Sequence, residues 1–259
     1  MNKIKLSELN PGDKHYKAYV GPPLTYDLVS SMQFSLLTAF GLRSFHKLLD
    51  IGCGSLRLGK LTIPFLDANN YYGIEPNDWL IDEGFNNELG KDIVSVKSPT
   101  FNTSSDFNLE IFNKEFDYLI AQSIFSHASS KQITTCLKQV KKVMKTNGIF
   151  LATFMLGIDN YSGDEWVYPG CVEYKHSFII NKVREQKLDA LKINWHHPNN
   201  QTWYVIFHPE NKKEIKKRIK FLFLVNKSKP MVVILFKLKN ILKQTKLGKI
   251  LIKIKNIIF

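Results

Sequence analysis

The segment Leu48-Leu49-Asp50-Ile51-Gly52-Cys53-Gly54 constrains the fold of this chain more than any other. An apolar run passes directly into two glycines separated by one residue, and a helical pattern begins at Gly59. Glycine lets the backbone turn tightly and approach a ligand closely, and in α/β folds such turns lie at the carboxyl edge of a parallel sheet. The segment therefore predicts a strand, a ligand-binding turn and a helix in succession.

Short apolar runs alternate with helical patterns between residues 46 and 208, as a parallel sheet with crossover helices requires. The expected strands are Lys47–Ile51, Tyr71–Glu75, Phe116–Ala121 and Ile149–Phe154, and the expected helices are Gly59–Leu66 and Ser130–Met144. Leu191–Trp195 and Thr202–Phe207 flank a polar stretch and predict a late antiparallel hairpin. Apolar residues at helical spacing from Leu28 to Phe40 predict an N-terminal helix.

The charge is distributed unevenly along the chain. Of the net charge of +13, residues 212–259 contribute 15 Lys/Arg and one acid, a balance of +14. The first 211 residues hold 21 basic and 22 acidic side chains, a balance of −1. We therefore predict three parts: an N-terminal helical cap (1–45), an α/β domain (46–208) and a basic helical extension (209–259).

An acidic residue ends the second predicted strand, as in nucleoside-binding α/β folds. Glu75 follows Gly54 by 21 residues, and a carboxylate there can accept hydrogen bonds from both hydroxyls of a ribose. NAD and S-adenosylmethionine (SAM) both use this geometry. An NAD fingerprint expects a third glycine where Arg57 stands, whereas here it falls at Gly59. Asp50, which precedes the glycines, suits the cationic amino-acid end of SAM, so the pattern favours SAM over NAD.

Four motifs, in order and at the right spacing, resemble those of the class I SAM-dependent methyltransferases over about residues 30–155. They are Leu49–Gly54, Tyr72–Pro76, Phe116–Ser123 and Asn147–Phe150. The resemblance implies a Rossmann-like fold with a mostly parallel sheet, and SAM as the cofactor. It also implies a cofactor site: Asp50, Gly52, Cys53 and Gly54 at the methionine portion, Glu75 and Pro76 at the ribose, Asp106 and Phe107 beside the adenine, and Gln122 and Ser123 at the end of the fourth strand.

Two histidines lie where this fold places substrates. An alcohol that accepts a methyl group benefits from a base, and histidine is the usual base near neutral pH. His127 follows the fourth predicted strand, and His197 lies in the late hairpin. Either is a candidate catalytic base; the alternative for each is a hydrogen-bonded structural histidine.

Aromatic and polar side chains near these histidines suggest the acceptor. The candidate substrate residues are Trp166 and Tyr168 in the segment after the fifth strand, and His196 and Trp203 in the hairpin. Aromatic faces beside polar groups suit a sugar, although a packed surface loop is the alternative. No aspartate pair follows the fourth strand, which argues against a metal-dependent catechol-type enzyme, so no metal is expected. Chains that resemble this one act in bacterial surface-glycan pathways. The resemblance therefore implies O-methylation of a sugar, a nucleotide-linked sugar or a capsule or lipopolysaccharide precursor.

The basic extension has lysines three or four residues apart, including Lys239, Lys243 and Lys246, which would form one stripe of a helix. A lysine-rich amphipathic helix suits an anionic membrane surface, and packing within the chain or an oligomer is the alternative. Nucleic acid is a poorer match because Arg218 is the only arginine of the segment.

Cysteine usage and the N-terminus bear on location. Cys53, Cys136 and Cys171 are unrelated in spacing, and the first residues lack an apolar run, so we expect a protein of the reducing cytoplasm. The basic tail adds the cytoplasmic membrane face as a candidate contact. Two other functions stay open at this point: an RNA methyltransferase that binds through the tail, and a non-catalytic SAM-binding protein at a membrane.

Overall fold

The computed structural model describes residues 5–222. The chain divides into two compact units, residues 1–212 and 213–259. In the second unit, residues 213–222 are helical, and Arg218 Nε donates a hydrogen bond to Glu214 Oε1 at 3.2 Å. The predicted lysine stripe lies outside the described residues. Within residues 5–222, no helix combines the length and apolarity that crossing a bilayer would require. The predicted boundaries of the cap, α/β domain and extension stay predictions.

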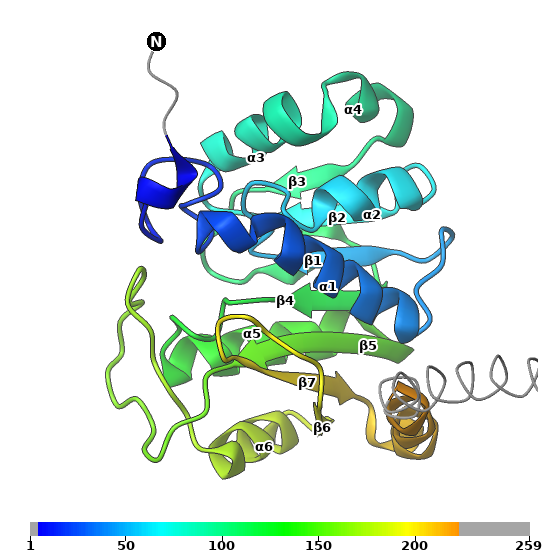
Figure 1. Ribbon diagram of the computed structural model, residues 1–259. Coiled ribbons are helices and arrows are strands. Elements are labelled where there is room, and N and C mark those ends of the chain that lie inside the picture. The colour runs from blue at the N-terminus through cyan, green and yellow to red at the C-terminus, as the bar shows by residue number, and fades with distance from the viewer. Residues whose placement is uncertain (1–4, 223–259) are drawn as a thin grey trace, which may run out of the picture. The chain divides into compact units, whose positions relative to one another are not determined.

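The first unit is built on a seven-stranded sheet with strand order β3-β2-β1-β4-β5-β7-β6 (Figure 1). The strands are Leu48–Ile51 (β1), Tyr71–Ile74 (β2), Thr100–Asn102 (β3), Phe116–Ala121 (β4), Met144–Phe154 (β5), Asp189–Ile193 (β6) and Thr202–Phe207 (β7). The first five strands pair in parallel, and β7 pairs antiparallel with both β5 and β6. The expected mostly parallel sheet with a late antiparallel hairpin is confirmed.

Helices cover both faces of the sheet. They are Tyr26–Ala39 (α1), Gly59–Phe65 (α2), Asp78–Gly84 (α3), Asp92–Lys97 (α4), Ser130–Val143 (α5) and His176–Glu185 (α6), with a π-helical turn at Phe85–Leu89 and a 3₁₀ turn at Leu109–Phe112 (η4). α1 contacts α2, and α2 contacts α4, whereas η4 and α6 contact α5. In Figure 1, α1 lies in front of the strands and α5 behind them.

Alternation along β1 assigns its side chains to these two layers. Leu49 and Ile51 belong to the core cluster that includes Leu137 of α5, and each fully buried residue of this kind contributes about 1.5–3 kcal/mol. Asp50 points to the other face, where its carboxylate accepts a hydrogen bond from the Tyr71 hydroxyl at 2.8 Å. The strand is buried on both faces, and Asp50 is the only polar residue in it.

Parallel register brings three strand ends together at one edge of the sheet. Ile51 pairs with Ile74, and Asp50 pairs with Ile120, so β1, β2 and β4 end at nearly the same level. The glycine turn, Glu75 and Gln122 directly follow these strand ends. The sheet therefore collects at one edge three motifs that are far apart in sequence.

Most predicted element bounds agree with the structure within one or two residues, and those of β4 and β7 agree exactly. β5 differs, because it begins at Met144 rather than Ile149, and its pairing with β4 contains a register shift between Phe116 and Tyr118. No prediction covered α3, α4, β3 or α6. α5 begins at a capping box in which Ser129 Oγ accepts from Gln132 N and Gln132 Oε1 accepts from Ser129 N.

Candidate active site

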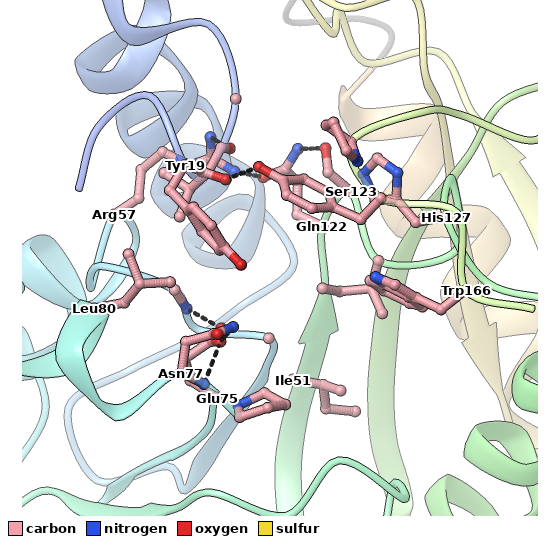
Figure 2. Close-up of a pocket in the computed structure, with 18 of the residues that line it drawn as sticks. Tyr19, Ile51, Arg57, Glu75, Asn77, Leu80, Gln122, Ser123, His127 and Trp166 are labelled. Carbon is pink, nitrogen blue, oxygen red and sulfur yellow. Dashed lines mark hydrogen bonds between the residues drawn. The ribbon is translucent and has the colours of Figure 1, made fainter. Parts of the chain in front are cut away.

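A cavity of about 670 Å³ opens at the carboxyl ends of β1, β2 and β4. Five further segments complete its wall: residues 11–22, the loop after β3, the loop after β4, residues 155–171 and residues 199–201. A cavity of this size accommodates a ligand of a few hundred daltons. Figure 2 shows Glu75 and Asn77 on one side of it, with Gln122, His127 and Trp166 on the other.

The glycine turn exposes backbone to this cavity. Gly52 and Gly54 have φ angles of 72° and 55°, a region that favours glycine. A Cβ atom at Gly52 would overlap the Ile124 side chain, and one at Gly54 would lie 2.6 Å from Val20 Cγ1. Ile74 accepts hydrogen bonds from Gly52 N at 2.8 Å and Cys53 N at 3.0 Å. A larger residue at either position would therefore collide with Ile124 or Val20, which line the cavity, and displace its wall.

Glu75 is held at the edge of the cavity by three donors. Its Oε1 accepts from Asn77 N at 2.9 Å and Asn77 Nδ2 at 2.8 Å, and its Oε2 accepts from Gly54 N at 3.1 Å. Burial raises the pKa of Glu75, while the Asn77 and Gly54 donors oppose that rise. A carboxylate offers about four acceptor sites, so Glu75 retains capacity for a hydroxyl of a ligand.

Asp50 does not reach the cavity. Its carboxyl group is buried, and burial raises its pKa to about 7, while the Tyr71 hydrogen bond counteracts the rise. Cys53 is buried beside it and does not line the cavity either. The predicted contact of these two side chains with the methionine portion of a cofactor is therefore not seen; both support the turn from behind.

Gln122, at the end of β4, is the centre of a buried polar network. Its Oε1 accepts from Arg57 Nη2 and from Gln33 Nε2, the latter at 2.9 Å. Its Nε2 faces Ser123 Oγ and, at 2.9 Å, His197 Nε2. The network fixes both Gln122 and Ser123 at the cavity wall, where the sequence placed them.

His197 is held by contacts to both of its ring nitrogens. Gln122 Nε2 lies 2.9 Å from His197 Nε2, and Asn199 N donates a hydrogen bond to His197 Nδ1 at 3.2 Å. Burial, followed by the nearby charge of Arg57, lowers the pKa of His197 to about 4. His197 does not line the cavity. Its lone pair is engaged and its proton affinity is low, so the geometry favours the structural alternative for this residue.

His127, unlike His197, faces the cavity. Its Nδ1 lies 2.6 Å from the carbonyl oxygen of Gly170. A carbonyl only accepts, so Nδ1 carries the proton and Nε2 of the neutral ring keeps its lone pair. Burial lowers the pKa of His127, which keeps the ring neutral near pH 7. Within residues 5–222, no hydrogen bond occupies Nε2.

The loop after β5 packs two aromatic rings around His127. The ring centroids of Trp166 and Tyr168 lie 5.6 and 5.0 Å from that of the imidazole, and both residues line the cavity. The Tyr168 hydroxyl donates to the carbonyl of Tyr19, which joins this loop to the N-terminal segment. Both segments therefore enclose one part of the cavity around His127.

Trp203 and His196 are not at the cavity. Trp203 lies in β7, between β5 and β6 in the sheet, and its side chain is fully buried. His196 is exposed. Phe107 and Pro76 line the cavity, whereas Asp106 is an exposed turn residue that accepts hydrogen bonds from Ser104 and Asn108.

Comparisons with known proteins agree with this architecture. Residues 49–150 match the sequence model of a methyltransferase domain. No curated protein sequence matches the chain significantly. Magnesium protoporphyrin IX methyltransferase from Synechocystis PCC 6803, solved with bound SAM, has a TM-score of 0.55 at 12% identity, over 72% of this chain and 81% of that one. The fold is that of the SAM-dependent methyltransferases.

Two more solved structures have the same methyltransferase fold. A SAM-dependent methyltransferase from Clostridium acetobutylicum ATCC 824 gives a TM-score of 0.52 at 16% identity, over 76% of this chain and 93% of that one. The glycopeptide N-methyltransferase MtfA complexed with SAM gives 0.53 at 10% identity, over 70% and 94%.

Several cavity residues of this methyltransferase fold escaped sequence reasoning. Arg57 follows the first motif by three residues and Asn77 directly follows the second, so their position next to the motifs was the available signal. Tyr19 precedes the Gly21-Pro22-Pro23 turn and reaches the cavity only because the N-terminal segment folds over the strand ends. Among residues 5–222 no group of three or more metal-binding side chains gathers.

Proposed function

We propose that this protein is a SAM-dependent methyltransferase that O-methylates a sugar or a surface-polysaccharide precursor. One observation carries the proposal: the glycine turn, the Glu75 carboxylate and His127 line a single cavity in a methyltransferase fold. When bound, SAM supplies an electrophilic methyl group on a sulfonium centre.

The cavity residues fit SAM from one end to the other. The backbone at Gly52 and Gly54 lines the cavity, where the methionine portion would lie, and Glu75 has acceptor capacity for the ribose. Phe107 supplies an aromatic face for the adenine. Gln122 and Ser123, which their hydrogen-bond network holds in place, also line the cavity.

His127 is the residue we assign as the base. Its neutral Nε2 can take the proton from an acceptor hydroxyl as the oxygen attacks, and the Gly170 carbonyl stabilises the imidazolium that results. Trp166 and Tyr168 exclude water around it and orient the acceptor.

The charge of the wall supports a neutral acceptor. Among the cavity-lining side chains of the described residues, only Arg57 and Glu75 carry charge, and no lysine lines the wall. Around His127 the lining is aromatic or uncharged: Gln132, Met155, Trp166, Tyr168, Pro169 and Cys171. Stacking on aromatic rings beside hydrogen-bonding groups is the way proteins bind sugars, and the absence of cations at this end favours the hydroxyl of a sugar over a phosphate.

Calorimetric titration with SAM and, separately, with NAD tests the proposal. We expect saturable SAM binding, and Glu75→Ala should weaken it by about 1.5–3 kcal/mol, or roughly 10- to 150-fold. Glu110→Ala, which removes an exposed carboxylate paired with Lys142 outside the cavity, is the control and should leave SAM affinity unchanged. Preference for NAD, or equal SAM affinity in the wild type and Glu75→Ala, would contradict the assignment.

We further propose that the basic tail holds the protein at an anionic membrane surface. Residues 213–259 carry 14 Lys/Arg and one acid, and each lysine near such a surface contributes about 1 kcal/mol. Deleting 213–259 should release the protein from vesicles that contain phosphatidylserine while SAM binding persists. Lys212 is retained because it pairs with Asp189 at 2.7 Å within the first unit. Vesicle sedimentation measures the effect, and undiminished binding after deletion would rule the tail out.

A further inference from the structure

Residues 11–22 form a strap that closes one side of the cavity. Five of them line it, among them Tyr19 and Val20, and Figure 2 shows the Tyr19 ring pointing into the cavity. Within residues 5–22 only Ala18 is buried, so the strap has almost no apolar core of its own. A segment with so few buried apolar contacts opens at a low free-energy cost unless polar contacts hold it in place.

One of the groups that hold the strap is the carboxylate of Glu88, in the π-helical turn after α3. Its Oε1 accepts a hydrogen bond from the Tyr16 hydroxyl at 2.9 Å and lies 3.1 Å from Lys17 Nζ. The side chains of Glu88 and Lys17 are only 11% and 17% exposed, so water and salt screen this ion pair weakly. None of these three residues lines the cavity, so any effect of Glu88 on a ligand passes through the strap.

The second oxygen of Glu88 connects the strap to α2 and the glycine turn. Oε2 accepts a hydrogen bond from Lys60 Nζ at 2.8 Å. The ammonium groups of Lys17 and Lys60 lie 4.9 and 4.7 Å from the centre of the Tyr26 ring. The Tyr26 hydroxyl in turn donates to the carbonyl of Ser55, next to the glycine turn, at 2.8 Å. One carboxylate therefore links the strap with elements that border the cavity.

Lys17 depends on Glu88 for its counter-charge. Lys60 also pairs with Asp27, but Glu88 is the only carboxylate that forms an ion pair with Lys17 within residues 5–222. Without the Glu88 charge, two partly buried ammonium groups would share one carboxylate, and the Asp27 side chain is 72% exposed. A cation held away from water without a counter-charge is unfavourable, so Lys17 should then turn to solvent and loosen the strap.

The strap also joins two sides of the cavity. The Tyr19 ring centroid lies 5.4 Å from that of Tyr168, in the loop after β5, and 5.2 Å from that of Trp79 in α3. The strap packs closely on the same loop, since a Cβ on Gly12 would lie 2.9 Å from Pro169 Cβ. A strap that moves away would therefore open the cavity between α3 and the loop that packs on His127.

We propose that Glu88 is a positioning residue for the proposed reaction: it holds the strap across the cavity and thereby slows the release of bound ligands. The inference rests on the proposed function for the identity of those ligands, but not on how the cofactor lies in the cavity. Ligand affinity falls with the fraction of molecules in which the strap is closed. Loss of the Glu88 charge should lower that fraction while the groups that line the cavity stay the same.

Hydrogen exchange tests the strap itself and needs no ligand. The amides of Gly12 and Tyr19 donate to carbonyls within the strap at 2.9 and 2.8 Å, so their exchange reports its opening. Glu88→Gln keeps the size of the side chain and removes its charge. Exchange of these amides, measured by mass spectrometry on strap peptides, should become about 10- to 100-fold faster, as expected when hydrogen bonds to a charged group are weakened.

Asp117→Asn is the matched control. Asp117 is also a carboxylate with little exposure, 15%, and it pairs with Lys145 at 2.7 Å, but it lies in β4 and does not line the cavity. It should leave strap exchange and ligand release unchanged even if it lowers the stability of the domain. Glu88→Asp, which keeps the charge on a shorter side chain, should restore part of the strap protection that Glu88→Gln loses.

Ligand release and steady-state kinetics test the consequence for the site. Stopped-flow displacement of SAM by excess S-adenosylhomocysteine should be about 10- to 100-fold faster in Glu88→Gln than in the wild type. The KM for SAM should rise, whereas kcat at saturating substrate should stay near the wild-type value, because His127 and Glu75 are untouched. A loss of stability alone would instead lower the amount of active enzyme and leave KM unchanged.

The remaining outcomes overturn the inference. Unchanged strap exchange in Glu88→Gln would show that the carboxylate does not hold the strap, and faster exchange throughout the domain would show a general loss of stability. Faster strap exchange with unchanged SAM release and KM would show that the strap does not control the cavity. If Glu88→Gln does not fold, Lys17→Met decides by the same measurements. A wild type that binds no SAM contradicts the proposed function, whereas strap exchange still tests the role of Glu88 by itself.

Discussion

Replacing His127 by alanine is expected to lower kcat for methyl transfer by about 10²- to 10⁴-fold, the range that a general base contributes. The reason is geometric: the Gly170 carbonyl fixes the proton on Nδ1, so Nε2 is free to accept a proton in the cavity. SAM affinity should change little, because Glu75 and the glycine turn lie elsewhere in the cavity. The measurement is the initial rate of methyl transfer to a hexose-containing acceptor at saturating SAM, beside calorimetric SAM binding.

The pH profile separates His127 from His197. Burial lowers the pKa of His127 below the ordinary 6.5, so kcat/KM should rise with pH through a midpoint below 6.5 and stay constant above it. This rise of kcat/KM with pH should vanish in His127→Ala and persist in His197→Ala. A base at His197 would instead give a midpoint of about 4, since burial and Arg57 lower its pKa to that value. Full activity in His127→Ala would remove this histidine from the reaction.

The central strands could be predicted because their largely apolar sequences indicate burial on both faces of a sheet. β1 and β4 are largely buried on both faces, and their sequences are apolar apart from Asp50 and Asp117. β3 has only three residues, Thr100–Asn102, all exposed or half-buried, and its sequence carries no such signal. It is a strand because β2 offers it a parallel partner, with Gly73 opposite Phe101. Tertiary pairing therefore defines that edge of the sheet.

The cofactor side of the cavity was predictable for the same reason. Gly52, Gly54, Glu75 and Gln122 directly follow strands, so the order of strands in the sheet brings them together. In the sequence, Arg57 was noted only as the residue that stands where an NAD fingerprint has its third glycine. Its contacts with Val20 and Gln122 could not be predicted, because they depend on the fold of the N-terminal segment and on β4. Sequence proximity to the turn could not indicate a buried cation.

The order of the strands in the sheet explains why the hairpin residues do not lie where the sequence predicted. His197 and Trp203 were expected near the acceptor because the late hairpin lies where this fold places substrates. In the structure β7 pairs along its two edges with β5 and β6, and residues 203–207 are all buried, so both faces of the strand are covered. The order of two antiparallel strands within a sheet is not encoded in either strand alone.

Trp203→Ala is therefore expected to lower the free energy of unfolding by about 3–5 kcal/mol, the cost of emptying a large core site. The side chain is fully buried, and domains of this kind are stable by only about 5–15 kcal/mol, so the variant should lose a large share of its stability. Urea denaturation followed by circular dichroism measures the difference. Trp203→Phe should cost less, because phenylalanine fills most of the volume and lacks the indole N–H, which is buried without a partner.

Trp166→Ala is the matched comparison. Its effects on stability and on the KM for the acceptor should be the reverse of those of Trp203→Ala. Trp166 is 41% exposed and lines the cavity beside His127, so its removal should change stability by less than about 0.5 kcal/mol while it raises KM for the acceptor. Trp203→Ala, assayed at a temperature where it remains folded, should keep an acceptor KM near that of the wild type. A stable Trp203→Ala with a strongly raised acceptor KM would restore Trp203 to the acceptor site, because only direct contact with the acceptor could produce that pair of results.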